Sequence, residues 1–142
     1  MTQPHHFPVR VYYEDTDFSG NVYHAAYLKF FERGRTEFLR DAGVHHHELE
    51  REGIAFAVRA MQIEFEGAAH IDDLLDVETN IASLGGVRLV LNQTIRRGGV
   101  ALTRASVTVV AIKTSGGVAR LPKAIRSLLL APDAPDSKKP AG

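Results

Sequence analysis

The pattern of apolar and polar residues begins with one short strand and one long helix. The stretch PVRVYYED is rich in β-branched and aromatic residues, and it predicts a first strand that starts after Pro8. From His24 the apolar residues recur at helical spacing, and Gly43 stands where a left-handed C-terminal cap is expected. Gly34 lies on the apolar stripe of this helix, which predicts that the helix backbone approaches something closely there, for example a sheet wrapped around it.

The remainder of the chain, from Ala55 onward, has the pattern of β-strands. Three GGV triplets start at Gly85, Gly98 and Gly116, and paired glycines between β-rich runs are hairpin-turn signals. They predict that VRLVLNQTIRR and VALTRASVTVVAIKTS form neighbouring antiparallel strands. A strand, a long helix and four further strands in a meander predict an α+β domain, with one central helix on an antiparallel sheet. Between helix and sheet, VHHHELEREG predicts a short polar helix or a loop.

The same pattern indicates one domain and a second copy of the chain. Residues 1–131 are predicted to form the domain, and the Pro-rich, polar residues 132–142 are predicted to be a disordered tail. One helix cannot cover both faces of five long strands. A homodimer that joins two sheets edge to edge is therefore expected, and pairing of dimers into a homotetramer is left open.

Composition and charge exclude several classes of function. Seventeen basic and seventeen acidic residues cancel, which argues against a nucleic-acid or anionic-membrane surface. The chain has no cysteine, so disulfides, thiolate nucleophiles and cysteine-based zinc sites are ruled out. No segment has the apolar length of a signal peptide or of a membrane span, and a cytoplasmic protein is the default expectation.

The junction between strand and helix, EDTDFSGNVYH, carries an unusual density of ionisable residues. Asp15, Asp17 and Ser19 with Gly20 match the start of an EF-hand calcium loop, but Ala26 stands where the loop needs its bidentate Glu. A turn with a helix cap is the plainest alternative, because these residue types favour turns and helix N-termini.

A hydrolytic site is the third interpretation of this junction. A carboxylate beside the free N–H groups of a helix start provides a base or nucleophile together with donors for a developing oxyanion. This interpretation accounts for Asp17 as a charged residue and for His24 at the start of the helix.

The segment YYEDTDFSGNVYHAAYLKFFERGRTEFLR resembles the opening of the 4-hydroxybenzoyl-CoA thioesterase family of hotdog-fold proteins. It is most similar to the acyl-CoA thioesterases associated with the bacterial Tol-Pal system, and the similarity continues through IDDLLDVETNI and RLPKAIRSLL. The resemblance implies a hotdog fold, in which a five-stranded antiparallel sheet wraps a long central helix. It also implies hydrolysis of acyl-CoA, without a metal or cofactor. A link to the Tol-Pal envelope machinery rests on the resemblance alone.

Carried over by position, the resemblance makes Asp17 the catalytic carboxylate, as nucleophile or as general base. The backbone N–H of His24 would polarise the thioester carbonyl, and Gly20 would let the substrate approach the backbone. Val22, Tyr23 and Tyr27 are candidate walls of the acyl site, and Tyr27 is also a candidate core residue. Asn21 and the stretch EGAAHIDD depart from the family pattern, which weakens inferences about the acyl chain and about contacts to the CoA phosphates.

Other residues have weaker claims. Among the basic residues that could contact the phosphates of CoA, Lys123 beside Pro122 is favoured. Glu32 is a candidate assistant to the site, although a solvated helix face explains it as well. The run His45–His47 is interpreted as surface residues, because adjacent side chains point in different directions.

The sequence thus predicts an acyl-CoA thioesterase. An acyl carrier protein remains an alternative carrier of the acyl group. A hotdog module that binds an acyl-thioester or a protein partner without turnover is the alternative function, and another hotdog activity, such as that of a hydratase, is less favoured.

Overall fold

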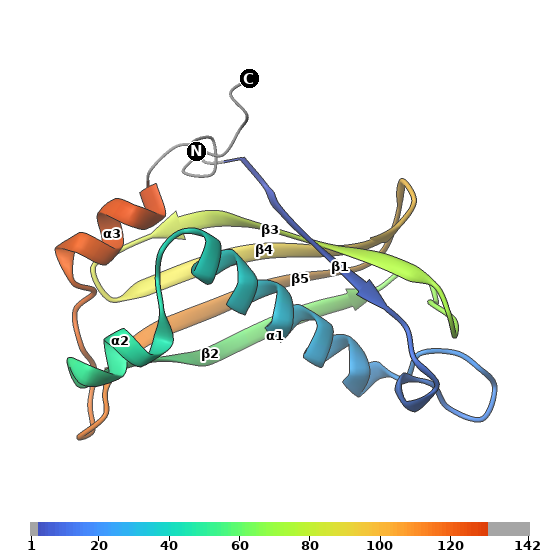
Figure 1. Cartoon of the computed structure of the whole chain (residues 1–142), viewed down its shortest axis with the longest axis horizontal. Coiled ribbons are helices and arrows are strands. Elements are labelled where there is room, and N and C mark those ends of the chain that lie inside the picture. The colour runs from blue at the N-terminus through green and yellow to red at the C-terminus, as the bar shows by residue number, and fades with distance from the viewer. Residues whose placement is uncertain (1–2, 131–142) are drawn as a thin grey trace.

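The computed structural model describes residues 3–130, so the predicted tail at 132–142 lies outside the described residues. Figure 1 shows a long helix lying across one face of a sheet, with two shorter helices at the far end. The elements in chain order are β1 (His5–Arg10), η1 (Tyr13–Asp15), α1 (His24–Asp41), α2 (His46–Arg51), β2 (Ile54–Phe65), β3 (Leu74–Leu84), β4 (Arg88–Arg97), β5 (Val100–Lys113) and α3 (Lys123–Leu130).

The sheet has the strand order β1-β3-β4-β5-β2, and its pairs are antiparallel. The predicted meander of four strands is therefore wrong in one respect, because β2 does not pair with β3. It pairs with β5 at the opposite edge, for example through Met61 and Val107. Glycine pairs mark the turns from β3 to β4 and from β4 to β5. The connection from β2 to β3 has no such pair, and it crosses the end of the sheet instead.

The first strand also differs from the prediction. It begins at His5, ahead of Pro8, and it ends at Arg10. Proline is tolerated here because β1 is an edge strand and the missing N–H removes no bond to a second neighbour. Val11 and Tyr12 belong to no strand, and Tyr13–Asp15 form the short 3-10 helix η1.

The core lies between α1 and the sheet. Phe30 and Phe31 on α1 are fully buried against the sheet, together with Leu75 and Leu91. Gly34 allows this approach, since a Cβ built on it would lie 2.5 Å from Cγ1 of Val77. The predicted close approach at Gly34 is confirmed.

Burial alternates along β5. Ala105, Val107, Val109 and Ala111 are buried on one face, and the residues between them are half-buried on the other face. The polar stretch after α1 forms the short helix α2, and Gly43 has the left-handed φ of +94° expected of a cap. Helix α3, which follows Pro122, was not predicted. No helix within residues 3–130 is long and apolar enough to cross a membrane.

Candidate functional site

Asp17 stands at the start of a tight reversal of the chain just before α1. Its N–H donates to the carbonyl of Asn21 at 2.9 Å, and its carbonyl accepts the N–H of Gly20 at 3.0 Å. Thr16 and Val22 form an isolated antiparallel bridge that closes this small hairpin. Gly20 has a φ of +84°, a conformation that favours glycine, so the turn depends on this residue.

The carboxylate of Asp17 is exposed and ionised. Its Oδ1 accepts the hydroxyl of Ser19 at 2.5 Å and the N–H of Ser19 at 2.8 Å. These bonds, the hydroxyl first, stabilise the negative charge and lower the pKa of Asp17 below its ordinary value near 3.8.

The start of α1 presents free donors beside this hairpin. Tyr23 precedes the helix and caps it with no side-chain hydrogen bond. Among the described residues the backbone N–H of His24 has no hydrogen-bond acceptor. The first turn of a helix carries a partial positive charge, so this position attracts a negative oxygen. The ring of His24 stacks on Phe65 with the centroids 4.3 Å apart.

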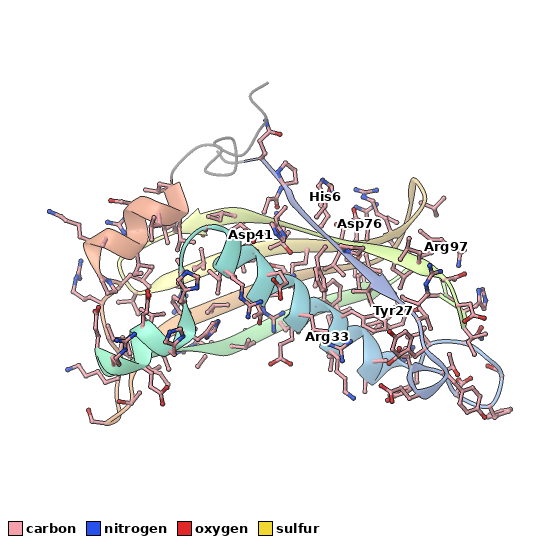
Figure 2. The ribbon with its side chains drawn as sticks, viewed as in Figure 1. His6, Tyr27, Arg33, Asp41, Asp76 and Arg97 are labelled. Atoms are coloured by element: carbon pink, nitrogen blue, oxygen red, sulfur yellow. The ribbon has the colours of Figure 1, made fainter. Side chains whose placement is uncertain are left out.

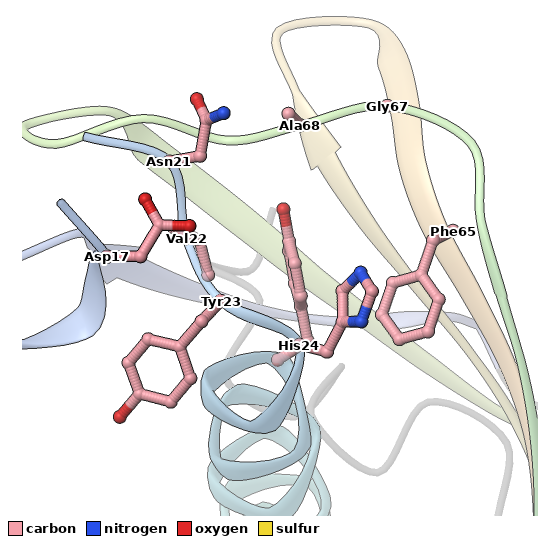
Figure 3. A pocket seen from close by; sticks show the side chains of 9 residues that line it. Asp17, Asn21, Val22, Tyr23, His24, Phe65, Gly67 and Ala68 are labelled. Carbon is pink, nitrogen blue, oxygen red and sulfur yellow. The ribbon is translucent and has the colours of Figure 1, made fainter. Parts of the chain in front are cut away.

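One cavity of about 320 Å³ brings these groups together (Figure 3). Figure 3 shows the rings of His24 and Phe65 face to face, with Asp17 across from them. The lining residues are Asp17, Asn21, Val22, Tyr23, His24, Tyr27, Phe65, Gly67 and Ala68. The cavity therefore joins a carboxylate, an open helix start and apolar walls.

Tyr27 is a core residue and a wall of the cavity at the same time. Its side chain is 2% exposed, and its hydroxyl oxygen accepts the N–H of Ala69 at 2.9 Å. Burial raises the pKa of Tyr27 above its ordinary value of 10.0, so the phenol keeps its proton at neutral pH.

Five of the seven site residues predicted from the sequence line this cavity: Asp17, Val22, Tyr23, His24 and Tyr27. Gly20 shapes the turn beside it but does not line it. Lys123 begins α3, which packs near Gly43 at the other end of α1, about 27 Å along an 18-residue helix. Figure 1 shows α3 at the opposite end of α1 from the hairpin, so within one chain Lys123 is far from Asp17.

The other candidate residues lie elsewhere. Asp15 is buried, and its Oδ2 accepts the N–H of Tyr12 at 2.8 Å, so it orders the chain before the hairpin. Glu32 lines a different cavity with Arg35 and Phe56. Within residues 3–130, no three His, Asp or Glu side chains gather into a group that could hold a metal ion.

Sequence reasoning missed four lining residues. Asn21 was noted only as a departure from the family pattern. Phe65 at the end of β2 and Gly67 and Ala68 in the β2–β3 connection had no local signal, because they lie far along the chain from the start of α1. The fold brings that connection to the hairpin before α1, where Asn21 and His70 form an antiparallel bridge.

Comparisons with known proteins agree with this architecture. The family model described as "Thioesterase-like superfamily" matches residues 11–129. The acyl-CoA thioesterase YbgC of Haemophilus influenzae is 46% identical over 107 residues, which cover 75% of this chain and 79% of that protein. The acyl-CoA thioester hydrolase YbgC of Escherichia coli O157:H7 is 50% identical over 93 residues, covering 63% of this chain and 66% of that protein.

The crystal structure of a probable thioesterase from Bartonella henselae superposes with a TM-score of 0.80. It is 46% identical, and the match covers 84% of this chain and all of that one. The chain therefore belongs to the thioesterase-like superfamily and has a hotdog fold, in which a five-stranded antiparallel sheet wraps a long central helix.

Proposed function

We propose that this chain is an acyl-CoA thioesterase, which hydrolyses acyl-S-CoA to a free carboxylic acid and CoA. The observation that carries the proposal is the shared cavity of Asp17 and the open N-terminus of α1. The relatives named as acyl-CoA thioesterases support the substrate class.

The chemistry follows from the two polar sides of the cavity. A thioester carbonyl oxygen within reach of the His24 N–H gains a donor and the positive end of the helix, and both become stronger interactions as the oxygen turns negative. The carbonyl carbon would then face Asp17. Val22, Tyr27 and Phe65 provide apolar surface for the acyl chain.

Asp17 can act in two ways. As a nucleophile its carboxylate oxygen bonds to the carbonyl carbon, the C–S bond breaks, CoA leaves as a thiolate that takes a proton, and water hydrolyses the mixed anhydride. As a general base it takes a proton from water while that water attacks. The lowered pKa of Asp17 keeps its carboxylate ionised at neutral pH, which both routes require.

The test is thiol release from a panel of short, aromatic and long acyl-CoAs, measured for the wild type and for Asp17→Asn. We expect turnover by the wild type and a fall in kcat of about 10²–10⁴-fold in the variant. Glu14→Gln is the matched control, because it removes a carboxylate three residues away that is exposed and does not line the cavity. Normal turnover by Asp17→Asn would defeat the assignment of this residue.

The same panel separates the alternatives. Binding of acyl-CoA by the folded wild type without thiol release would support the non-catalytic binding module. Release from acyl carrier protein substrates but not from CoA substrates would change the carrier and leave the site unchanged.

We further propose that the chain acts as a homodimer joined through β2. Val58 and Phe65 on this edge strand are 49% and 43% exposed in the single chain, which leaves apolar surface for a second copy. Light scattering after gel filtration distinguishes monomer, dimer and tetramer, and a monomer at assay concentration would contradict the proposal.

A further inference from the structure

One wall of the cavity is made by the connection from β2 to β3. Gly67 and Ala68 in this connection line the cavity, and the N–H of the next residue, Ala69, donates to the hydroxyl oxygen of Tyr27. The wall is irregular backbone, so its position depends on the bonds that its ends make with the rest of the protein.

The same connection holds the hairpin that carries Asp17. The carbonyl of Ala69 accepts the N–H of Val22 at 2.9 Å, and the carbonyl of Gly20 accepts the N–H of Ile71 at 3.1 Å. Asn21 and His70 form the antiparallel bridge between the two segments. A shift of the connection would therefore move the hairpin and the start of α1 with it.

Arg97, the last residue of β4, fastens this connection. Its Nη1 donates to the carbonyl of Ala68 at 3.1 Å and to Oδ2 of Asp73 at 2.8 Å, and it lies 3.5 Å from Nδ1 of His70. The same carboxylate oxygen of Asp73 accepts the N–H of His70 at 2.9 Å. Figure 2 shows Arg97 and Tyr27 near the same end of the molecule.

The negative charge on Asp73 strengthens its hydrogen bond with Arg97. Partial burial works to raise the pKa of Asp73, but the bonds from His70 and Arg97 outweigh it and hold the pKa below the ordinary value. Asp73 is therefore ionised at neutral pH, and its bond to Arg97 is charge-assisted.

We propose that Arg97 is a positioning residue for the site, which fixes the Gly67–Asp73 connection and thereby sets Asp17 relative to the open N–H of His24. This inference rests on the proposed function, and no contact of Arg97 with substrate is required. Acyl transfer is sensitive to such placement, since a misplacement of about 1 Å can cost about 100-fold in rate.

A purely structural role of Arg97 is distinguished from a positioning role by comparing the change in Tm with the change in kcat. The side chains of Arg97 and Asp73 are 39% and 23% exposed, and ion pairs of this kind add little to global stability. Loss of Arg97 should therefore lower Tm by no more than about 4 °C. A large kinetic effect with a small change in Tm is the signature of positioning.

The experiment compares Arg97→Met with the wild type and with Arg96→Met. Arg96 is the matched control, because it precedes Arg97 on the same strand and pairs with Glu78 at 3.3 Å, away from the connection. We expect Arg97→Met to lower kcat about 10-fold or more with a smaller change in KM. The control should stay within about twofold of the wild type.

Amide hydrogen exchange gives a readout that does not depend on activity. In Arg97→Met the N–H groups of Val22 and Ala69 should exchange about 10-fold faster or more, since their bonds depend on the connection, and in Arg96→Met they should not. If Arg97→Met does not fold, Asp73→Leu removes the acceptor oxygen of the same contact, and the same results are expected of it.

The outcomes separate the two proposals. An unchanged kcat in Arg97→Met, from an active wild type, overturns the positioning role. A wild type without any turnover defeats the proposed function. In that case the amide hydrogen exchange of Val22 and Ala69 alone tests whether Arg97 holds the connection. Faster exchange supports the role of Arg97 in holding the segment, and unchanged exchange overturns it.

Discussion

The hydroxyl oxygen of Tyr27 lies 2.9 Å from the backbone nitrogen of Ala69 and accepts its N–H. This bond joins the first turn of α1 to the wall of the cavity opposite it. Ala69 is fully buried, so the bond also satisfies a donor that water cannot reach. The bond therefore holds the start of α1 at a fixed distance from the cavity wall at Ala69.

The first prediction follows from this contact. Tyr27→Phe keeps the ring but leaves the buried N–H of Ala69 without its acceptor, which should lower the free energy of unfolding by about 1–3 kcal/mol. Urea titration followed by circular dichroism measures it. Tyr13→Phe deletes a hydroxyl from a ring that is 81% exposed, and it should change the free energy by less than about 0.5 kcal/mol. Equal effects in the two variants would contradict the role given to the Tyr27 hydroxyl.

The second prediction concerns the close approach of α1 to the sheet. Alanine is the better helix former by about 1 kcal/mol, so Gly34→Ala would stabilise an isolated helix. Here the new Cβ would lie 2.5 Å from Cγ1 of Val77 and 3.3 Å from Nε2 of Gln93. Overpacking costs about 1–3 kcal/mol, and we expect a net loss of unfolding free energy.

Thermal and urea unfolding check this expectation. Arg33→Ala is the control, because Arg33 is the exposed neighbour on the same helix and should change the free energy by less than about 0.5 kcal/mol. A Gly34→Ala variant more stable than the wild type would show that the sheet moves aside at Val77 without cost.

The sequence predicted the part of the site that is local in the chain. Asp17 and His24 are seven residues apart at a junction between strand and helix, and Tyr27 lies one helical turn later, so turn chemistry and helical spacing bring them together. The same reasoning predicted the close approach at Gly34, because a glycine on an apolar helical stripe has a cost that needs a reason.

The rest of the site depends on contacts between distant segments. Phe65 and Ala68 reach the start of α1 because β2 pairs with β5 at the far edge of the sheet, and the predicted meander had β2 elsewhere. Neither residue type marks a functional position by itself. Lys123 remains a prediction for CoA binding, and a partner subunit would have to bring it to the cavity.

The third prediction concerns pH. The proposed mechanism needs the ionised carboxylate of Asp17, which forms above its pKa, and the hydrogen bonds from Ser19 lower that pKa below the ordinary value near 3.8. Activity due to Asp17 is therefore fully present at neutral pH and is lost only as the pH falls through this lowered pKa. We expect kcat/KM to stay constant from about pH 5 to pH 8 as far as Asp17 is concerned. Circular dichroism at each pH separates titration from acid unfolding.

Ser19→Ala tests the cause of that shift. The hydroxyl of Ser19 is the largest contribution to the lowered pKa of Asp17, and its loss leaves the Ser19 N–H as the remaining donor from this residue. The pKa should rise toward the ordinary value, so the acid limb of kcat/KM should move to higher pH. Thr16→Val is the matched control, because its hydroxyl donates to the carbonyl of Tyr13 and not to Asp17. An acid limb that moves equally in both variants, or in neither, would show that another group limits activity in acid.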